Sequence, residues 1–171
     1  MEKRIGVLAY GLIVVGIFSR LLPHPPNMTP LVAVALFSGA YLPRRVAIVV
    51  PLSVMIISDG LIGFSMQAVF GWAAFAIVGC IGFLLRQRVS VQRLIPATLG
   101  SSTLFFFLSN FGVWLEGRLY PWTLSGLRAC YLAGVPFYRN MLAGDVLYTA
   151  ALFSFVALAR SWQRQPATLS N

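Results

Sequence analysis

The stretch Gln67–Leu85, with the sequence QAVFGWAAFAIVGCIGFLL, contains no charged residue and is almost entirely apolar. A helix needs roughly 20 apolar residues to cross the hydrocarbon core of a bilayer. This stretch is close to that length, and Arg86 and Arg88 follow it directly. It therefore predicts a transmembrane helix and indicates a membrane protein.

Helical spacing divides this stretch into faces. One stripe contains Val69, Ala73, Ala76 and Cys80, flanked by the bulky Trp72, Phe83, Phe70 and Ile77. We expect this stripe to form a narrow slot in which a flat ligand reaches the sulfur of Cys80. In the alternative, Cys80 is a small hydrophobic residue packed against another helix, as free cysteines commonly are. On the opposite side, small residues predict the close approach of a neighbouring helix: Ala68, Gly71, Gly79 and Gly82.

The composition places the whole chain in the same class. Hydrophobic residues make up 58% of the 171 residues and charged residues only 10%, against about 25% charged in an average soluble domain. The length allows about six spans with short loops, hence a single all-α membrane domain over residues 1–171. Two cysteines without paired spacing predict neither a disulfide framework nor a zinc site. No nucleotide-binding loop occurs.

Prolines and basic residues delimit six expected spans, at about 5–22, 30–41, 46–58, 67–85, 94–114 and 140–159. Pro23 ends the first span, and Thr29 followed by Pro30 is typical of a helix start. A long connection is expected at 116–138, with a short interfacial helix at 123–133 inside it.

The net charge of +9 is read here as a topology signal, with no nucleic-acid partner expected. With the N-terminus inside, nine basic residues fall on the inner face: Lys3, Arg4, Arg44, Arg45, Arg86, Arg88, Arg93, Arg160 and Arg164. Four fall on the outer face: Arg20, Arg118, Arg128 and Arg139. Because short cytoplasmic loops are enriched in Lys and Arg, both termini are predicted to be cytoplasmic.

Polar residues near the spans gather at their expected outer ends, and they are Asn27, Asp59, Asn110, Glu116, Arg139, Asn140 and Asp145. Ionisable groups inside spans usually face the protein interior or a wet cavity. Asp145 is therefore a ligand candidate, with a structural ion pair to Arg139 or a bond to a neighbouring helix as the alternative. Asp59 is read as a helix-end or turn residue, since Asp-Gly is a turn signal.

Several motifs resemble the BtuM family of small membrane proteins. They are residues 21–30 (LLPHPPNMTP), 58–60 (SDG), 110–115 (NFGVWL) and the run 120–140 through LRACY at 127–131. That family is similar to the substrate-binding S-components of energy-coupling-factor (ECF) transporters. The resemblance implies a six-helix fold in the bacterial inner membrane, with an outward-facing pocket that binds cobalamin.

The resemblance also implies that the thiol of Cys80 is the axial ligand of the cobalt. Because a thiolate pushes electron density toward the opposite axial position, we expect it to assist reductive loss of the upper ligand (decyanation). A soft thiolate is a suitable donor. The further residues expected to contact the bound cobalamin are Asn27, Asp59, Ala73, Ala76, Asn110, Tyr131 and Arg139. His24, the only histidine, is the competing axial ligand, while Cys130 is expected to pack against aromatic residues of the outer loop.

The energy source and the function class leave alternatives open. S-components that share an ATPase module pack against it through small residues four apart on the first span, a pattern that is missing here. We therefore expect a solitary transporter, with dependence on a shared ATPase module as one alternative. A membrane thiol oxidoreductase using Cys80 and Cys130 is another, although a disulfide needs Cα atoms within about 7 Å.

Overall fold

A computed structural model describes residues 2–163 of the chain, and within them the structure is all-helical. The elements are α1 (Glu2–Leu21), α2 (Leu31–Tyr41), α3 (Arg44–Ile62), α4 (Met66–Ile81), the 3₁₀ helix η1 (Gly82–Leu85), α5 (Val91–Glu116) and α6 (Leu124–Gln163). The all-α prediction is confirmed for this part of the chain. Arg164, counted above among the inner basic residues, lies outside the described residues.

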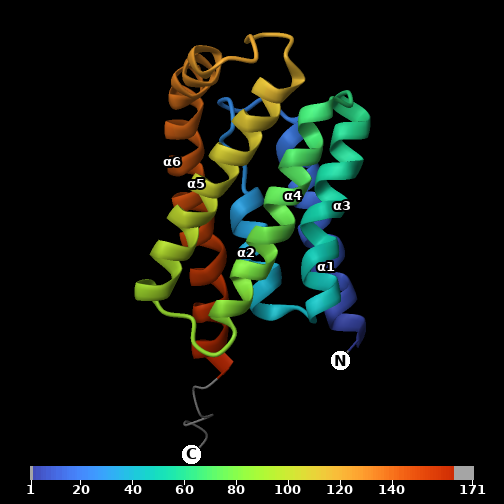
Figure 1. Cartoon of the computed structure of the whole chain (residues 1–171). Coiled ribbons are helices and arrows are strands. Elements are labelled where there is room, and N and C mark those ends of the chain that lie inside the picture. Colours follow the sequence, from blue (N-terminus) through green and yellow to red (C-terminus); the bar gives the residue numbers. More distant parts are fainter. Residues whose placement is uncertain (1, 164–171) are drawn as a thin grey trace, which may run out of the picture.

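The helices form an elongated bundle in which successive helices run in opposite directions (Figure 1). We call the end with the α3–α4 turn and the α5–α6 connection the cavity end. The opposite end, where the chain begins and where α6 finishes, is the terminal end. Arg44, Arg86 and Arg93 stand at helix starts or loops of the terminal end.

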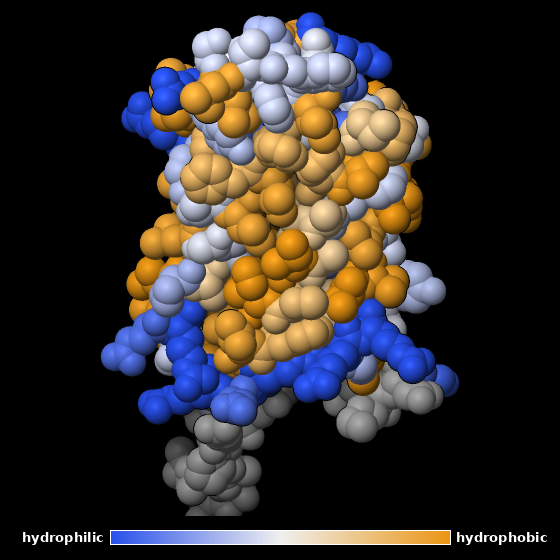
Figure 2. All heavy atoms as spheres, viewed as in Figure 1, coloured by the Kyte–Doolittle hydropathy of each residue, from blue (hydrophilic) through white to orange (hydrophobic). Residues whose placement is uncertain are grey.

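Four of the helical segments are long and apolar enough to cross a membrane: Arg44–Ile62, Met66–Leu85, Val91–Glu116 and Leu124–Trp162. Two shorter apolar helices, Ile5–Leu21 and Leu31–Tyr41, complete the set of six. On the face in Figure 2, a broad apolar belt lies between a strongly hydrophilic band at the terminal end and a mixed surface at the cavity end. These features are compatible with a membrane protein.

The long connection expected at 116–138 is wrong. Only residues 117–123 separate α5 from α6, and α6 continues for 40 residues straight through Pro136. The expected interfacial helix is thus the first part of α6. A proline inside a helix removes one backbone hydrogen bond, but the turns on both sides of Pro136 pack against α5. Tertiary packing therefore outweighs the local break. The α2 start is also shifted, since Pro30 is its N-cap residue.

The core of the bundle is α2. Nine consecutive residues, Leu31–Gly39, are buried, as expected for a helix that is apolar all round. The last carbonyls of α2 are held by Arg86, whose Nε donates to the Gly39 carbonyl at 2.8 Å and whose second nitrogen donates to the Leu42 carbonyl. A cation beside a helix C-terminus is favourable. The terminal end of α2 is therefore fixed.

Glycines allow α2 and the end of α4 to touch through their backbones. A Cβ on Gly82 would lie 2.6 Å from the Leu36 carbonyl oxygen, and one on Gly39 would lie 2.6 Å from the Gly82 Cα. A Cβ on Gly79 would lie 3.4 Å from the Ala47 carbonyl oxygen of α3. The predicted close approach of a helix to Gly79 and Gly82 is thus confirmed.

We predict that Gly39→Ala destabilises the protein, because the added methyl group meets backbone atoms that cannot rotate away. Overpacking of this kind costs about 1–3 kcal/mol. The matched control is Gly100→Ala on α5, where a Cβ meets nothing within 4 Å, so the substitution gains helix propensity. The measurement is thermal unfolding of each purified variant in one detergent. Equal midpoints for Gly39→Ala and wild type would contradict the packing.

Candidate functional site

A large cavity lies at the cavity end, beyond the start of α2. With 11 residues, α2 is about 16 Å long, so it fills only part of the length of the bundle (Figure 1). The cavity has a volume of about 510 Å³ and is lined by residues of α1, α3, α4, α5 and α6 and of the three loops at this end, which are α1–α2, α3–α4 and α5–α6. A smaller cavity of about 220 Å³ shares Arg20, Asn27 and Met55 with it and reaches Asp145.

The loop between α1 and α2 closes one side of both cavities and carries Asn27. The Met28 N–H donates to the Pro25 carbonyl at 3.0 Å, and Asn27 has a positive φ of 63°. Proline followed by a residue with positive φ is the pattern of a type II turn, and asparagine tolerates that conformation. The turn is seated on α6, because a Cβ on Gly144 would lie 2.8 Å from the Met28 Cγ.

A charged cluster of three side chains stands on the cavity wall. Arg20 of α1 contacts the Asp59 carboxylate of α3 at 2.6 Å. The indole N–H of Trp72 on α4 donates to the other carboxylate oxygen at 2.7 Å. Arg20 also donates to the Ser58 hydroxyl at 2.6 Å. Asp59 is buried, so its charge is matched by Arg20 and its second oxygen by an N–H donor, as a buried carboxylate requires.

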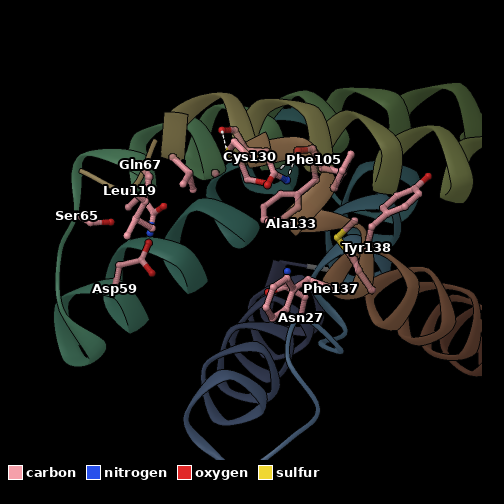
Figure 3. Close-up of a pocket in the computed structure, with 18 of the residues that line it drawn as sticks. Asn27, Asp59, Ser65, Gln67, Phe105, Leu119, Cys130, Ala133, Phe137 and Tyr138 are labelled. Carbon is pink, nitrogen blue, oxygen red and sulfur yellow. Dashed lines mark hydrogen bonds between the residues drawn. The ribbon is translucent and has the colours of Figure 1, made fainter. Parts of the chain in front are cut away.

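The facing wall is built from aromatic and amide side chains of α5 and α6. The Asn110 amide donates to the Phe106 carbonyl at 2.8 Å, and the Cys130 thiol donates to the Asn110 carbonyl at 3.3 Å. The Phe106 and Tyr138 rings stack with centroids 4.7 Å apart. Figure 3 shows Asp59, Ser65 and Gln67 on one side of the pocket and Cys130, Phe137 and Tyr138 on the others. The cavity thus combines an ion pair, amides and ring faces.

Comparison with known families gives one assignment. Residues 1–168 match the model of a family described as "Family of unknown function (DUF6580)". The chain belongs to this family. No curated protein and no solved structure gives a significant match.

The predicted site residues divide into two groups. Asn27, Asp59 and Asn110 line the cavity. Asp59, read from the sequence as a turn residue, lies instead inside α3 and is ion-paired.

Cys80 and the alanines of its stripe are not among the residues that line either cavity. Cys80 is exposed on the bundle surface, Ala73 is exposed and Ala76 is half-buried. Along α4, Cys80 lies about 13 Å beyond Gly71, the last α4 residue that lines the large cavity, and about 7.5 Å beyond Phe75, which lines the smaller one. The expected slot in front of Cys80 is therefore part of the outer surface of the bundle.

Tyr131 and Arg139 also lie outside the lining of both cavities. The Tyr131 hydroxyl donates to the Phe107 carbonyl at 2.9 Å, which ties α6 to α5. Arg139 is exposed. His24 lines the smaller cavity, and its Nδ1 is 2.7 Å from the Leu22 carbonyl oxygen.

Two residues of the site, Arg20 and Cys130, were not predicted as such from the sequence. Arg20 entered only the charge count, although a lone arginine at the end of an apolar span needs a partner, and Asp59 ends another span. Cys130 was assigned to an outer loop because the sixth span was expected to begin only at Asn140. In the structure Cys130 is buried in α6 and lines the cavity.

We predict that Arg20→Gln destabilises the protein strongly, because it leaves the buried Asp59 carboxylate without its charge partner. Breaking a buried ion pair from one side costs about 3–5 kcal/mol. The matched control is Arg118→Gln, since the Arg118 side chain is 80% exposed and contacts Glu116 only at 3.5 Å. Thermal unfolding in detergent is the measurement. A Tm loss of the same size in both variants would contradict a structural role for the Arg20–Asp59 pair.

Proposed function

We propose that this chain is a membrane protein that binds a small organic solute in its cavity and carries it into the cell. The observation that carries this proposal is the cavity of about 510 Å³, lined by the Arg20–Asp59 pair and by aromatic rings. Ligand pockets of about 300–1,000 Å³ with a few convergent polar groups are typical of small-molecule sites.

The charge distribution supports an outward-opening cavity. Six arginines of the described residues belong to loops and helix ends at the terminal end: Arg44, Arg45, Arg86, Arg88, Arg93 and Arg160. Under the positive-inside rule this end faces the cytoplasm. The cavity end then faces outward, both termini are cytoplasmic, and the inner membrane of a bacterium is the proposed location.

The lining indicates the chemistry of the solute. Phe105, Phe106 and Tyr138 present apolar ring surface, on which a flat ring packs well. Asn27 and Gln67 add amide groups that both donate and accept hydrogen bonds. The charged wall is already neutralised internally by the Arg20–Asp59 contact. We therefore propose an uncharged or zwitterionic solute with a flat ring, of the size of a water-soluble vitamin.

We predict that one compound of a panel of uncharged or zwitterionic vitamins (riboflavin, nicotinamide, pyridoxine and cyanocobalamin) stabilises the purified protein. A ligand at a hundred times its Kd stabilises by about 2.7 kcal/mol, which a thermal-unfolding assay resolves. Gln67→Leu should weaken binding about tenfold, because it removes an amide that lines the cavity. The control is Gln92→Leu, an exposed glutamine at the start of α5. If no compound raises the Tm, the proposed solute class is wrong.

Cobalamin uptake, which the sequence resemblance implies, is the second candidate function, because one thiol does line the cavity. That thiol belongs to Cys130 and not to Cys80. A corrinoid is larger than the other vitamins of the panel, so it would extend from the cavity mouth. Under this candidate function, Cys130 takes the role of axial cobalt ligand and of the thiol that assists decyanation.

We predict that any change in the absorption spectrum of cyanocobalamin on mixing with the protein depends on Cys130. Cys130→Ala should abolish the change, because it removes the cavity thiol. Cys80→Ala is the matched control and should leave the change intact, since Cys80 is exposed elsewhere. If the spectral change is lost in Cys80→Ala and kept in Cys130→Ala, Cys80 is the cobalt ligand. If wild type shows no spectral change at all, cobalamin is excluded as the solute.

The thiol oxidoreductase alternative receives less support. Cys130 is the seventh residue of α6, and α6 begins at the cavity end. Cys80 is the last but one residue of α4, and α4 ends toward the terminal end (Figure 1). The two thiols thus lie toward opposite ends of the bundle, too far apart to form a disulfide within one chain. We propose uptake by a solitary carrier, without a dedicated ATPase module.

A further inference from the structure

Asp145 of α6 is the most deeply buried carboxylate of the described residues, with a relative exposure of 1%. It takes part in neither of the two ion pairs among these residues. Among the described residues its side chain makes one hydrogen bond, with the Ser102 hydroxyl of α5, at 2.6 Å. An isolated carboxylate in a low-dielectric interior is costly, and it is normally neutralised by a cation or a proton.

The contacts of Ser102 indicate a proton. A serine hydroxyl has one hydrogen to donate, yet the Ser102 Oγ lies 2.6 Å from the Asp145 Oδ2 and 3.0 Å from the Thr98 carbonyl oxygen. With an ionised Asp145 the single hydrogen of Ser102 would have to be shared between the two acceptors, whereas a protonated Asp145 makes each contact a full two-centre hydrogen bond. Asp145 then donates to Ser102, and Ser102 donates to the Thr98 carbonyl.

A second hydroxyl group, that of Thr149, lies near Asp145 in the sequence and has no hydrogen-bond partner among the described residues. Thr149 lies one turn after Asp145 on the same face of α6 and is 2% exposed. When Asp145 loses its proton, Ser102 can turn its single hydrogen to the carboxylate. The unpartnered Thr149 hydroxyl, one helical turn away, is a further donor available to the ionised state.

The solute cavity gives Asp145 a route to water. Asp145 lines the smaller cavity, which shares Arg20, Asn27, Met55, Ile62, Phe105 and Met141 with the large one. The charged or titratable groups that line the smaller cavity with Asp145 are Arg20 and His24. Of the two helices packed on α6, α5 has no charged residue between Arg93 and Glu116, and α2 has only Tyr41, at its far end.

We propose that Asp145 is a proton-binding site that exchanges its proton through the solute cavity. The proton comes from water at the cavity mouth, binds a carboxylate oxygen, and is held there by donation to Ser102. If the chain carries a solute as proposed above, the proton and the solute share one connected space. Solute entry is then coupled to proton binding, and an inward proton gradient can drive uptake without an ATPase.

The test is infrared spectroscopy of the purified full chain at neutral pH, without any solute. Wild type is expected to show the C=O band of a protonated carboxylic acid, and Asp145→Asn is expected to lose it. Ser102→Ala should keep the band but move it to higher frequency, because the acid loses its acceptor. A missing band in wild type, or an unchanged band in Asp145→Asn, would overturn the proposal. If Asp145→Asn fails to fold, the Ser102→Ala shift decides.

The route is tested by transfer into D₂O, which shifts the same band as the proton exchanges. Ala133→Trp fills part of the cavity, since Ala133 lines it, and should slow the exchange at least about tenfold. Ala73→Trp is the control, because Ala73 is exposed outside the cavity, and should leave the rate unchanged. Equal rates in both variants would refute exchange through the cavity.

Coupling is tested separately with the panel compound that stabilises the protein. Its stabilising effect should differ between mildly acidic and mildly alkaline buffer in wild type, and not in Asp145→Asn. If no compound binds, the proposed transport function and its coupling to the proton are wrong. The proton-binding site is tested independently by the infrared band of Asp145.

Discussion

The structure depends on one constraint: α2 is buried on every side but is too short to fill the bundle. Its 11 residues pack against α3, α4 and α6, and its close contacts to α4 are made through Gly39 and Gly82. Backbone-to-backbone packing leaves no slack for α2 to slide toward the cavity end, and Arg86 holds its last carbonyls at the terminal end. The empty space above the start of α2 is therefore a fixed feature of the fold.

That space explains where the polar groups are found. Inside a membrane, polar groups need partners within the protein or a wet cavity. Arg20, Asp59 and Trp72 satisfy one another on the cavity wall, and the Asn110 amide is satisfied by the backbone of its own helix. Asp145 lines the smaller cavity, and its carboxyl group contacts the Ser102 hydroxyl. The lining thus changes from the Arg20–Asp59 ion pair near the cavity end to a carboxyl–hydroxyl contact between α6 and α5.

The two thiols illustrate why burial could not be read from the sequence. The stretch 67–85 is apolar nearly all round, so its pattern does not say which stripe faces the protein and which faces the surroundings. The glycine side of α4 was correctly expected to meet a neighbour, which leaves the Cys80 side on the surface. Cys130 was placed in a loop because the sixth span was expected to begin only at Asn140, yet α6 begins at Leu124, packs on α5 and continues through Pro136.

The sequence by itself determined the all-helical class, the positions of five helices to within a few residues, and the close approach at Gly79 and Gly82. These features follow from the length of the apolar runs, from helix-ending prolines and from side-chain size, which are local properties. Tertiary structure alone decided that Arg20 pairs with Asp59, that Asn27 and Asn110 face the same cavity, and that Cys130 replaces Cys80 there. Each of these depends on how far one helix is rotated and shifted against another, and for apolar helices that is set by the packing of the whole bundle.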